Sequence, residues 1–188
     1  MEIVNYSDIP LSPTLIWIKR QLDFDQTRKS QPALMISEAT IDTQVNSLDP
    51  ANFEADLAEF AEAQPHLMDY LTNEENGAFT TAEQELLLFA GLVIYRSVGA
   101  ENPVIEIMEG PQIAELEEKN FSLLQEQKAR SFRDRITVFF DKSDQEDLLA
   151  FIEDLLLDEE NTDVTAEGRE PLFISLKTVM DVLLLATS

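Results

Sequence analysis

The stretch "TAEQELLLFAGL", residues 81–92, returns later in the chain as "TAEGREPLFISL", residues 165–176. The two stretches lie 84 residues apart (165 − 81) and share a Thr-Ala-Glu triplet, a Leu-Phe pair and a final Leu. A threonine and an acidic residue ahead of an apolar run are typical of a capped helix N-terminus. The recurrence of such a segment at a long separation indicates an internal repeat.

Two more pairs of segments keep the same order along the chain. "DLAEFAE" at 56–62 and "DLLAFIE" at 147–153 share the pattern D-L-x-x-F-x-E, and Glu-Glu-Asn occurs at both 74–76 and 159–161. Acidic, leucine-rich helices resemble one another in any protein. The matching Phe, Asn and Thr positions are not required by helix composition, so they favour duplication.

The predicted fold class is therefore all-α or nearly so. We expect two tandem helical repeats of roughly 90 residues, 6–94 and 95–187, packed as a pseudo-symmetric helical bundle in one compact domain. The chain has 188 residues, enough to bury roughly 70% of its unfolded surface. It contains only five glycines and few turn pairs, which argues against a β-sandwich or barrel.

Prolines and capping residues predict where the helices begin. Pro13 follows a Ser12 cap, Asp49-Pro50 opens a second helix, and Pro65 should kink or restart that helix. Thr80 and Glu83 form a capping box. Apolar spacing then predicts helices from residue 13, from residue 49, at 86–98, and near 111–130, 132–141, 144–158 and 169–187.

Two segments leave the choice between helix and strand open. "ATIDTQV" at 39–45 and "RITVFF" at 135–140 contain β-branched residues in partial alternation, so each could form a short strand. Phe132, Ile136 and Phe139 also follow a helical spacing, as do Leu34, Ile41 and Val45 in another stripe. We favour helix for both segments.

The charge of the chain limits its partners. Thirteen Lys and Arg oppose 37 Asp and Glu, a formal net charge of −24, which argues against binding nucleic acid or an anionic membrane surface. The N-terminus "MEIVNYSDIP" has no basic start or apolar run, and no apolar run is long enough to span a bilayer. With no cysteine in the chain, these features predict a cytoplasmic protein.

The segment "TNEENGAFTTAE", residues 72–83, resembles the twelve-residue calcium-binding loop of an EF-hand. Glu74, Asn76 and Glu83 would occupy ligand positions 3, 5 and 12, and a glycine stands at position 6. Thr72 departs from the motif, because the first position requires Asp. The alternative is a connector between two helices, in which Glu83 serves only in the capping box.

Other candidate sites are few. The chain has one histidine, His66, which excludes multi-histidine metal sites, and it has no glycine-rich phosphate loop or nucleophile elbow, so we predict no catalytic residue and no cofactor. Glu153, Asp154 and Asp158 cluster near a helix C-terminus, where they either attract a cation or basic partner or remain solvated. His66 has Glu62 one turn before it, but Pro65 intervenes.

Four of the thirteen cations form a basic island at 128–135, consisting of Lys128, Arg130, Arg133 and Arg135. The island is a candidate interaction site for an anion, or it pairs with acidic groups of the twin unit or of a second subunit. Pairing within the chain is the simpler interpretation.

These observations favour a non-enzymatic, acidic helical interaction protein that binds or neutralises a basic protein partner. Two alternatives remain open. One is a cation-binding module that uses residues 72–83, and the other is a small-ligand-binding or enzymatic helical bundle with a pocket between the two units.

Overall fold

The computed structural model describes residues 35–73, 79–157 and 164–187, all of which belong to the unit Leu34–Ser188. Every regular element among these residues is a helix, which confirms the all-α class. The segments 39–45 and 135–140 lie within helices, so the preference for helix over strand is also confirmed. The helix expected from Pro13 lies outside the described residues.

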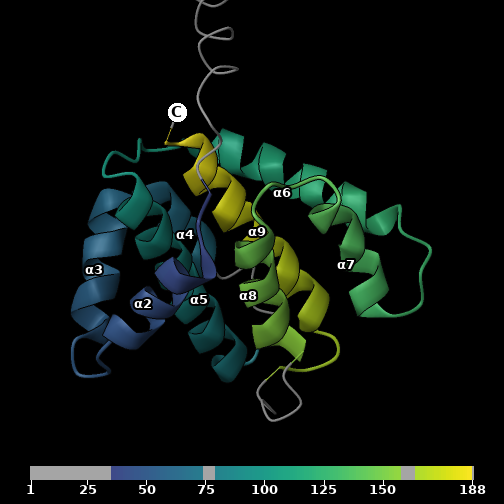
Figure 1. Cartoon of the computed structure of the whole chain (residues 1–188), viewed down its shortest axis with the longest axis horizontal. Helices are drawn as coiled ribbons and strands as arrows, with labels where there is room; N and C mark the ends of the chain where they lie inside the picture. Colours follow the sequence, from purple (N-terminus) through teal and green to yellow (C-terminus); the bar gives the residue numbers. More distant parts are fainter. Residues whose placement is uncertain (1–34, 74–78, 158–163, 188) are drawn as a thin grey trace, which may run out of the picture. The chain divides into compact units, whose positions relative to one another are not determined.

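Figure 1 shows the helices in their order along the chain. In chain order they are α2 (Glu38–Ser47), α3 (Phe53–Ala63), α4 (Pro65–Thr72), α5 (Thr81–Glu101), α6 (Gly110–Gln125), α7 (Phe132–Phe140), α8 (Glu146–Leu157) and α9 (Arg169–Leu185).

The helices α5 and α9 form the centre of the core. On α9 every residue from 172 to 180 is buried, and on α5 the run 90–94 is buried. A helix that is apolar on all sides needs neighbours on all sides. Accordingly, α9 packs against α5, α6 and α8, and Figure 1 shows its yellow ribbon running between them. Within the described residues no helix is long and apolar enough to cross a membrane.

Pro65 separates α3 from α4, as predicted. Gln64 leaves the helical conformation with φ −136° and ψ 66°, and Pro65 then takes the first position of α4, where a missing N–H costs no hydrogen bond. The buried Gln64 amide donates hydrogen bonds to the carbonyl oxygens of Ile105 and Glu106, at 3.4 and 3.1 Å. The Gln64 side chain, at the break between α3 and α4, therefore binds the backbone of the linker that joins α5 to α6.

Several helix boundaries differ from the sequence-based expectation, and two of them lie next to turns that the structure describes. The helix predicted at 111–130 ends at Gln125. The next helix begins at 132 as predicted, where Ser131 caps α7 by accepting a hydrogen bond from Asp134 N at 3.1 Å. The helix expected from Asp49-Pro50 begins at Phe53. The Asp49 carboxylate accepts hydrogen bonds from Ala51 N and Asn52 Nδ2, which forms a turn ahead of the helix.

Candidate functional site

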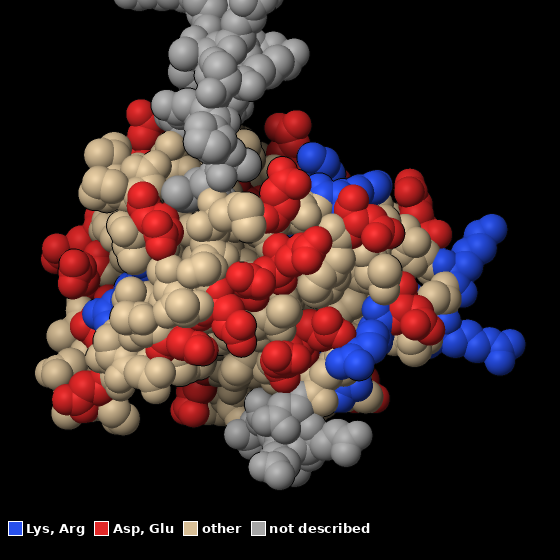
Figure 2. Space-filling model, in the orientation of Figure 1, with Lys and Arg blue, Asp and Glu red and all other residues tan. Residues whose placement is uncertain are grey.

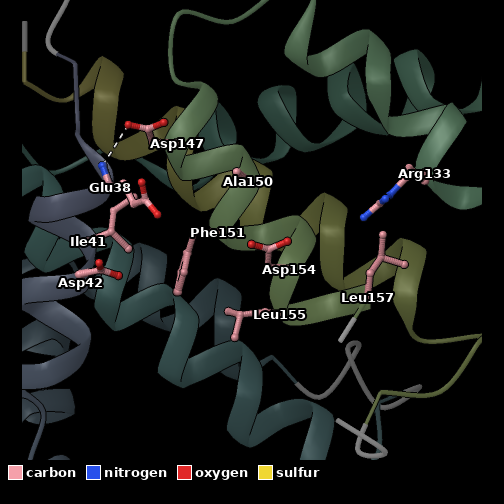
Figure 3. A pocket seen from close by; sticks show the side chains of 10 residues that line it. All are labelled: Glu38, Ile41, Asp42, Arg133, Asp147, Ala150, Phe151, Asp154, Leu155 and Leu157. Carbon is pink, nitrogen blue, oxygen red and sulfur yellow. Dashed lines mark hydrogen bonds between the residues drawn. The ribbon is translucent and has the colours of Figure 1, made fainter. Parts of the chain in front are cut away.

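A groove lies between α2 and α8, with a volume of about 590 Å³ (Figure 3). Its floor is apolar and is formed by Ile41, Ala150, Phe151, Leu155 and Leu157. Ile41 is 4% exposed, and the four α8 residues are half-buried. The α8 residues face the groove because side chains three or four positions apart share one side of a helix. We call this site the α2–α8 groove.

Four carboxylates line the rim of the α2–α8 groove: Glu38, Asp42, Asp147 and Asp154. All four residues are exposed, so the groove is open to solvent. None of them takes part in the ion pairs found among the described residues. Asp147 Oδ2 accepts a hydrogen bond of 3.0 Å from Glu38 N, which places a carboxylate at the N-terminus of α2. Asp147 therefore also stabilises the start of α2.

Arg133 lies at one end of the same groove (Figure 3). Its Nε is 2.7 Å from Glu153 Oε1 on α8, and its side chain is 67% exposed. A carboxylate of α8 therefore already binds an arginine of the chain. Asp158, the third acid of the predicted cluster, lies outside the described residues.

The basic island divides into two pairs. Arg133 and Arg135 form ion pairs within the chain, with Glu153 and Glu170. Both acids belong to the range 95–187, so these pairs lie within one predicted unit and do not reach the other. Lys128 and Arg130 are exposed and take part in no ion pair found among the described residues. A role for the island in interaction stays a prediction.

Glu83 is 1% exposed and connects the start of α5 to the segment before α9. Its Oε2 accepts a hydrogen bond from Thr80 N at 2.8 Å, which confirms the capping box. Its Oε1 accepts from Thr165 N at 2.9 Å and Thr165 Oγ1 at 2.7 Å. Burial raises the pKa of Glu83, but hydrogen bonds from Thr165 and Thr80 lower it below its ordinary value. Its stabilising effect is therefore present above that ordinary pKa and is lost as the pH falls.

The other two proposed calcium ligands, Glu74 and Asn76, lie outside the described residues, so the EF-hand interpretation stays a prediction. Among the described residues no group of three or more His, Cys, Asp or Glu side chains could hold a metal ion. Both oxygens of Glu83 already accept hydrogen bonds. Coordinating a cation would require Glu83 to exchange these contacts.

We expect the thermal midpoint of unfolding to be the same in calcium and in chelator, because the Glu83 carboxylate is already engaged. A ligand that binds only the native state at 100 times its dissociation constant stabilises it by about 2.7 kcal/mol. Such binding would raise the midpoint by several degrees. Differential scanning calorimetry in calcium, in magnesium and in EDTA measures this directly. A rise specific to calcium would support the cation-binding alternative.

His66 lies near a carboxylate at the start of α6. Its Nε2 is 3.4 Å from Glu109 Oε2, and both side chains are exposed. Glu62 is not its partner, because the chain leaves the helix at Gln64 and α4 begins at Pro65. The pair is a surface contact between the start of α4 and the start of α6.

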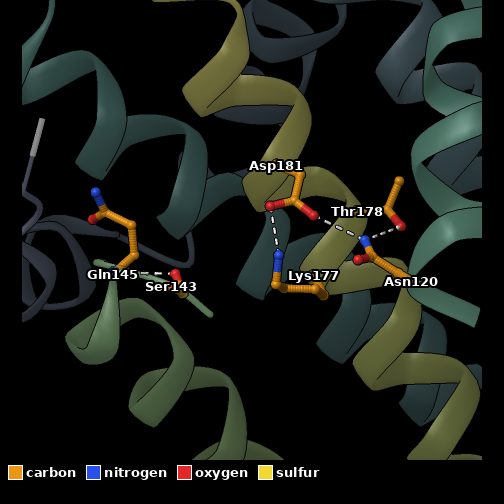
Figure 4. Close-up of polar contacts among 6 residues, drawn as sticks. All are labelled: Asn120, Ser143, Gln145, Lys177, Thr178 and Asp181. Atoms are coloured by element: carbon orange, nitrogen blue, oxygen red, sulfur yellow. Dashed lines mark hydrogen bonds and ion pairs between the residues drawn. The ribbon is translucent and has the colours of Figure 1, made fainter. Parts of the chain in front are cut away.

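A polar cluster between α6 and α9 was not predicted from the sequence (Figure 4). Lys177 is 7% exposed, and its Nζ lies 2.5 Å from Asp181 Oδ1. Asp181 Oδ2 accepts a hydrogen bond of 2.9 Å from Asn120 Nδ2, which is also 3.4 Å from Thr178 Oγ1. The Lys177 ammonium lies 5.8 Å from the centroid of the Phe139 ring. These groups satisfy one another, so the cluster is a structural contact.

Tyr70 makes a second polar contact with α6. Its hydroxyl donates a hydrogen bond of 2.8 Å to Glu117 Oε1, and burial strongly raises its pKa. In the sequence, these polar contacts were indicated only by Lys177 and Asp181, which are four residues apart in a largely apolar helix.

A second groove, of about 750 Å³, lies beside α3, α5 and the linker to α6. Its lining includes Gln64, Tyr95, Gly99 and Ile107. Its cation, Arg96, is already paired with Asp56 at 2.6 Å. This groove lacks the acidic rim of the α2–α8 groove.

No protein-family model, curated protein or solved structure significantly matches this chain.

Proposed function

We propose that this protein is a non-enzymatic, acidic helical interaction protein that binds a basic protein partner in the cytoplasm. The observation that supports this function best is the α2–α8 groove, which combines an apolar floor with four exposed carboxylates. Protein interfaces combine an apolar centre with a polar rim, and charge complementarity selects the partner. A site for a small ligand typically buries most of the ligand's surface, whereas this groove is open to solvent, so the groove favours a protein partner.

The distribution of charge supports the same proposal. Figure 2 shows Asp and Glu spread across the visible face, whereas Lys and Arg gather mainly toward the side of α6 and α7. A net charge of −24 attracts cationic proteins over a long range and repels nucleic acids and anionic membrane surfaces. The negative electrostatic field raises the rate at which a basic protein meets this chain, and the α2–α8 groove is the surface to which we propose that it binds.

We also propose that the chain arose from two tandem units, 6–94 and 95–187. The central helices α5 and α9, predicted to be equivalent, pack against each other. A threonine hydroxyl ahead of each helix accepts a hydrogen bond from the N–H three residues later, Thr80 from Glu83 and Thr165 from Gly168, although the predicted repeat aligns Thr165 with Thr81. An experimental structure of the whole chain tests this duplication, and units that fail to superimpose would contradict it.

The first experiment is recovery of the partner with tagged full-length protein from its own cells. We expect a basic protein to be retained at about 0.05 M salt and lost at about 1 M, because the screening length falls to about 3 Å at 1 M. Quantitative mass spectrometry across the salt series measures the retention. An unrelated acidic helical protein of similar net charge serves as the control. A partner retained equally at both ends of the series would contradict an electrostatic interface.

A further inference from the structure

We infer that the α2–α8 groove is the docking site for an amphipathic helix of the basic partner. Apolar side chains of this helix contact Phe151 and Leu155, and its arginines lie against the acids of the rim, Asp147 and Asp154 on α8 and Asp42 on α2. The inference rests on the proposed function and specifies which surface and which structural element carry it.

The apolar floor of the groove is the surface that the apolar face of the partner helix contacts. Ile41 is almost fully buried, whereas Phe151 and Leu155 are half-buried and leave apolar surface open to the groove. Covering such surface is favourable by about 25 cal/mol per Å². An α-helix is about 10–12 Å across with its side chains, so a groove of about 590 Å³ admits side chains and not the whole helix. The partner helix therefore lies along the open side of the groove and inserts its apolar side chains into it.

The acids on the rim of the groove determine how far apart the cationic residues of the partner helix must lie. Asp147 and Asp154 are seven residues apart on α8, a rise of about 10 Å along the axis. A partner helix that runs along α8 repeats with the same period, so cations at positions i and i+7 can face both acids. Leucines at i+3 and i+4 then fall between them, above Phe151 and Leu155.

The chain itself shows how α8 binds arginine. Arg133 reaches the groove from α7 and pairs with Glu153, the neighbour of Asp154. No hydrogen bond or ion pair from the described residues is found at the carboxylates of Asp42 or Asp154. An arginine of the partner can therefore bind either acid without displacing a contact from the described residues, and guanidinium groups bind carboxylates through charge-assisted hydrogen bonds.

The test uses a fluorescein-labelled synthetic peptide of about 14 residues, built from Ala, Leu and Arg, with arginines at i and i+7 and leucines at i+3 and i+4. Fluorescence anisotropy at low salt measures its affinity for the full-length protein. A peptide of the same composition with scrambled order, and one with a central proline, test the helical face. We expect both to bind at least about tenfold more weakly than the designed peptide.

The decisive variant is Asp42→Asn together with Asp154→Asn, which spares Asp147 because of its hydrogen bond to the start of α2. We expect the double variant to bind the designed peptide about tenfold more weakly, since each exposed ion pair contributes modestly. Glu115→Gln with Glu118→Gln removes the same charge from exposed positions on α6 and should change the affinity less than about twofold. Circular dichroism confirms that all variants fold alike.

The outcomes separate this inference from the proposed function. Equal weakening by both double variants, equal binding of the scrambled peptide, or no binding of the designed peptide would overturn the groove assignment. The same variants are then used to recover the cellular partner at low salt. A basic partner retained by the Asp42 and Asp154 variant would overturn the groove assignment but leave the proposed function standing. Failure of the wild-type protein to retain any basic partner would contradict the proposed function itself.

Discussion

Gly168→Ala is expected to lower the free energy of unfolding by about 3 kcal/mol. An ideal Cβ at this position would lie 1.9 Å from Glu83 Oε1 and 2.6 Å from Glu83 Cδ. A free glutamate side chain would move aside, but Glu83 is held by hydrogen bonds from Thr80 and Thr165. The added methyl group therefore has to break these contacts or displace the backbone before α9. Urea unfolding followed by circular dichroism measures the change.

Gly110→Ala is the matched control for this substitution. Gly110 lies in the first turn of α6, and nothing lies within 4 Å of a Cβ added there, so we expect no loss of stability. A double-mutant cycle with Glu83→Ala isolates the steric contact, because Gly168→Ala should cost much less once the carboxylate is absent. An equal cost in both backgrounds would show that the contact with Glu83 is not the cause.

Asp181→Ala is expected to lower the free energy of unfolding by about 3 kcal/mol, because it leaves the buried Lys177 ammonium without its anion. The Asn120 amide loses its acceptor at 2.9 Å in the same step. Burial makes this pair unlike an exposed ion pair, which contributes about 1 kcal/mol or less. Equilibrium unfolding in urea at neutral pH measures the loss.

Two comparisons test the cause of that loss. Asp69→Ala removes an exposed acid from α4 and should change the stability by less than about 0.5 kcal/mol. Lys177→Met combined with Asp181→Leu replaces the buried pair with apolar groups and should recover most of the lost stability. If Asp181→Ala were as mild as Asp69→Ala, or if the double variant recovered nothing, the uncompensated charge would not be the reason.

Local signals in the sequence were sufficient to predict the helical class and several helix ends. The Thr80 and Glu83 capping box, the restart at Pro65 and the helical choice for 39–45 and 135–140 are all confirmed. Each depends on contacts within about one turn of helix, so the neighbouring residues contain the information. The end of α6 was predicted five residues too late, because residues 126–130 contain no glycine or proline that would mark the end of a helix.

The candidate site was only partly predictable. The excess of acidic residues predicted a basic partner, but it did not distinguish the rim of the α2–α8 groove from other carboxylates. The groove forms where α2 and α8 meet, and the contact from Glu38 N to Asp147 joins residues 109 positions apart. The basic island was noticed, but which of its members pair depends on the positions of α8 and α9.

The sequence by itself determined that the chain is helical, strongly acidic and without the residues of common catalytic motifs, because propensity, capping and net charge are properties of short segments and of composition. The tertiary structure alone decided that Glu83 bonds to Thr165, that Lys177 is buried against Asp181, and which acids surround an apolar groove. Burial and pairing arise from the packing of distant helices. The sequence allows Glu83 to be a helix cap or a calcium ligand, but its hydrogen bonds to Thr165 form only when the distant helices pack together.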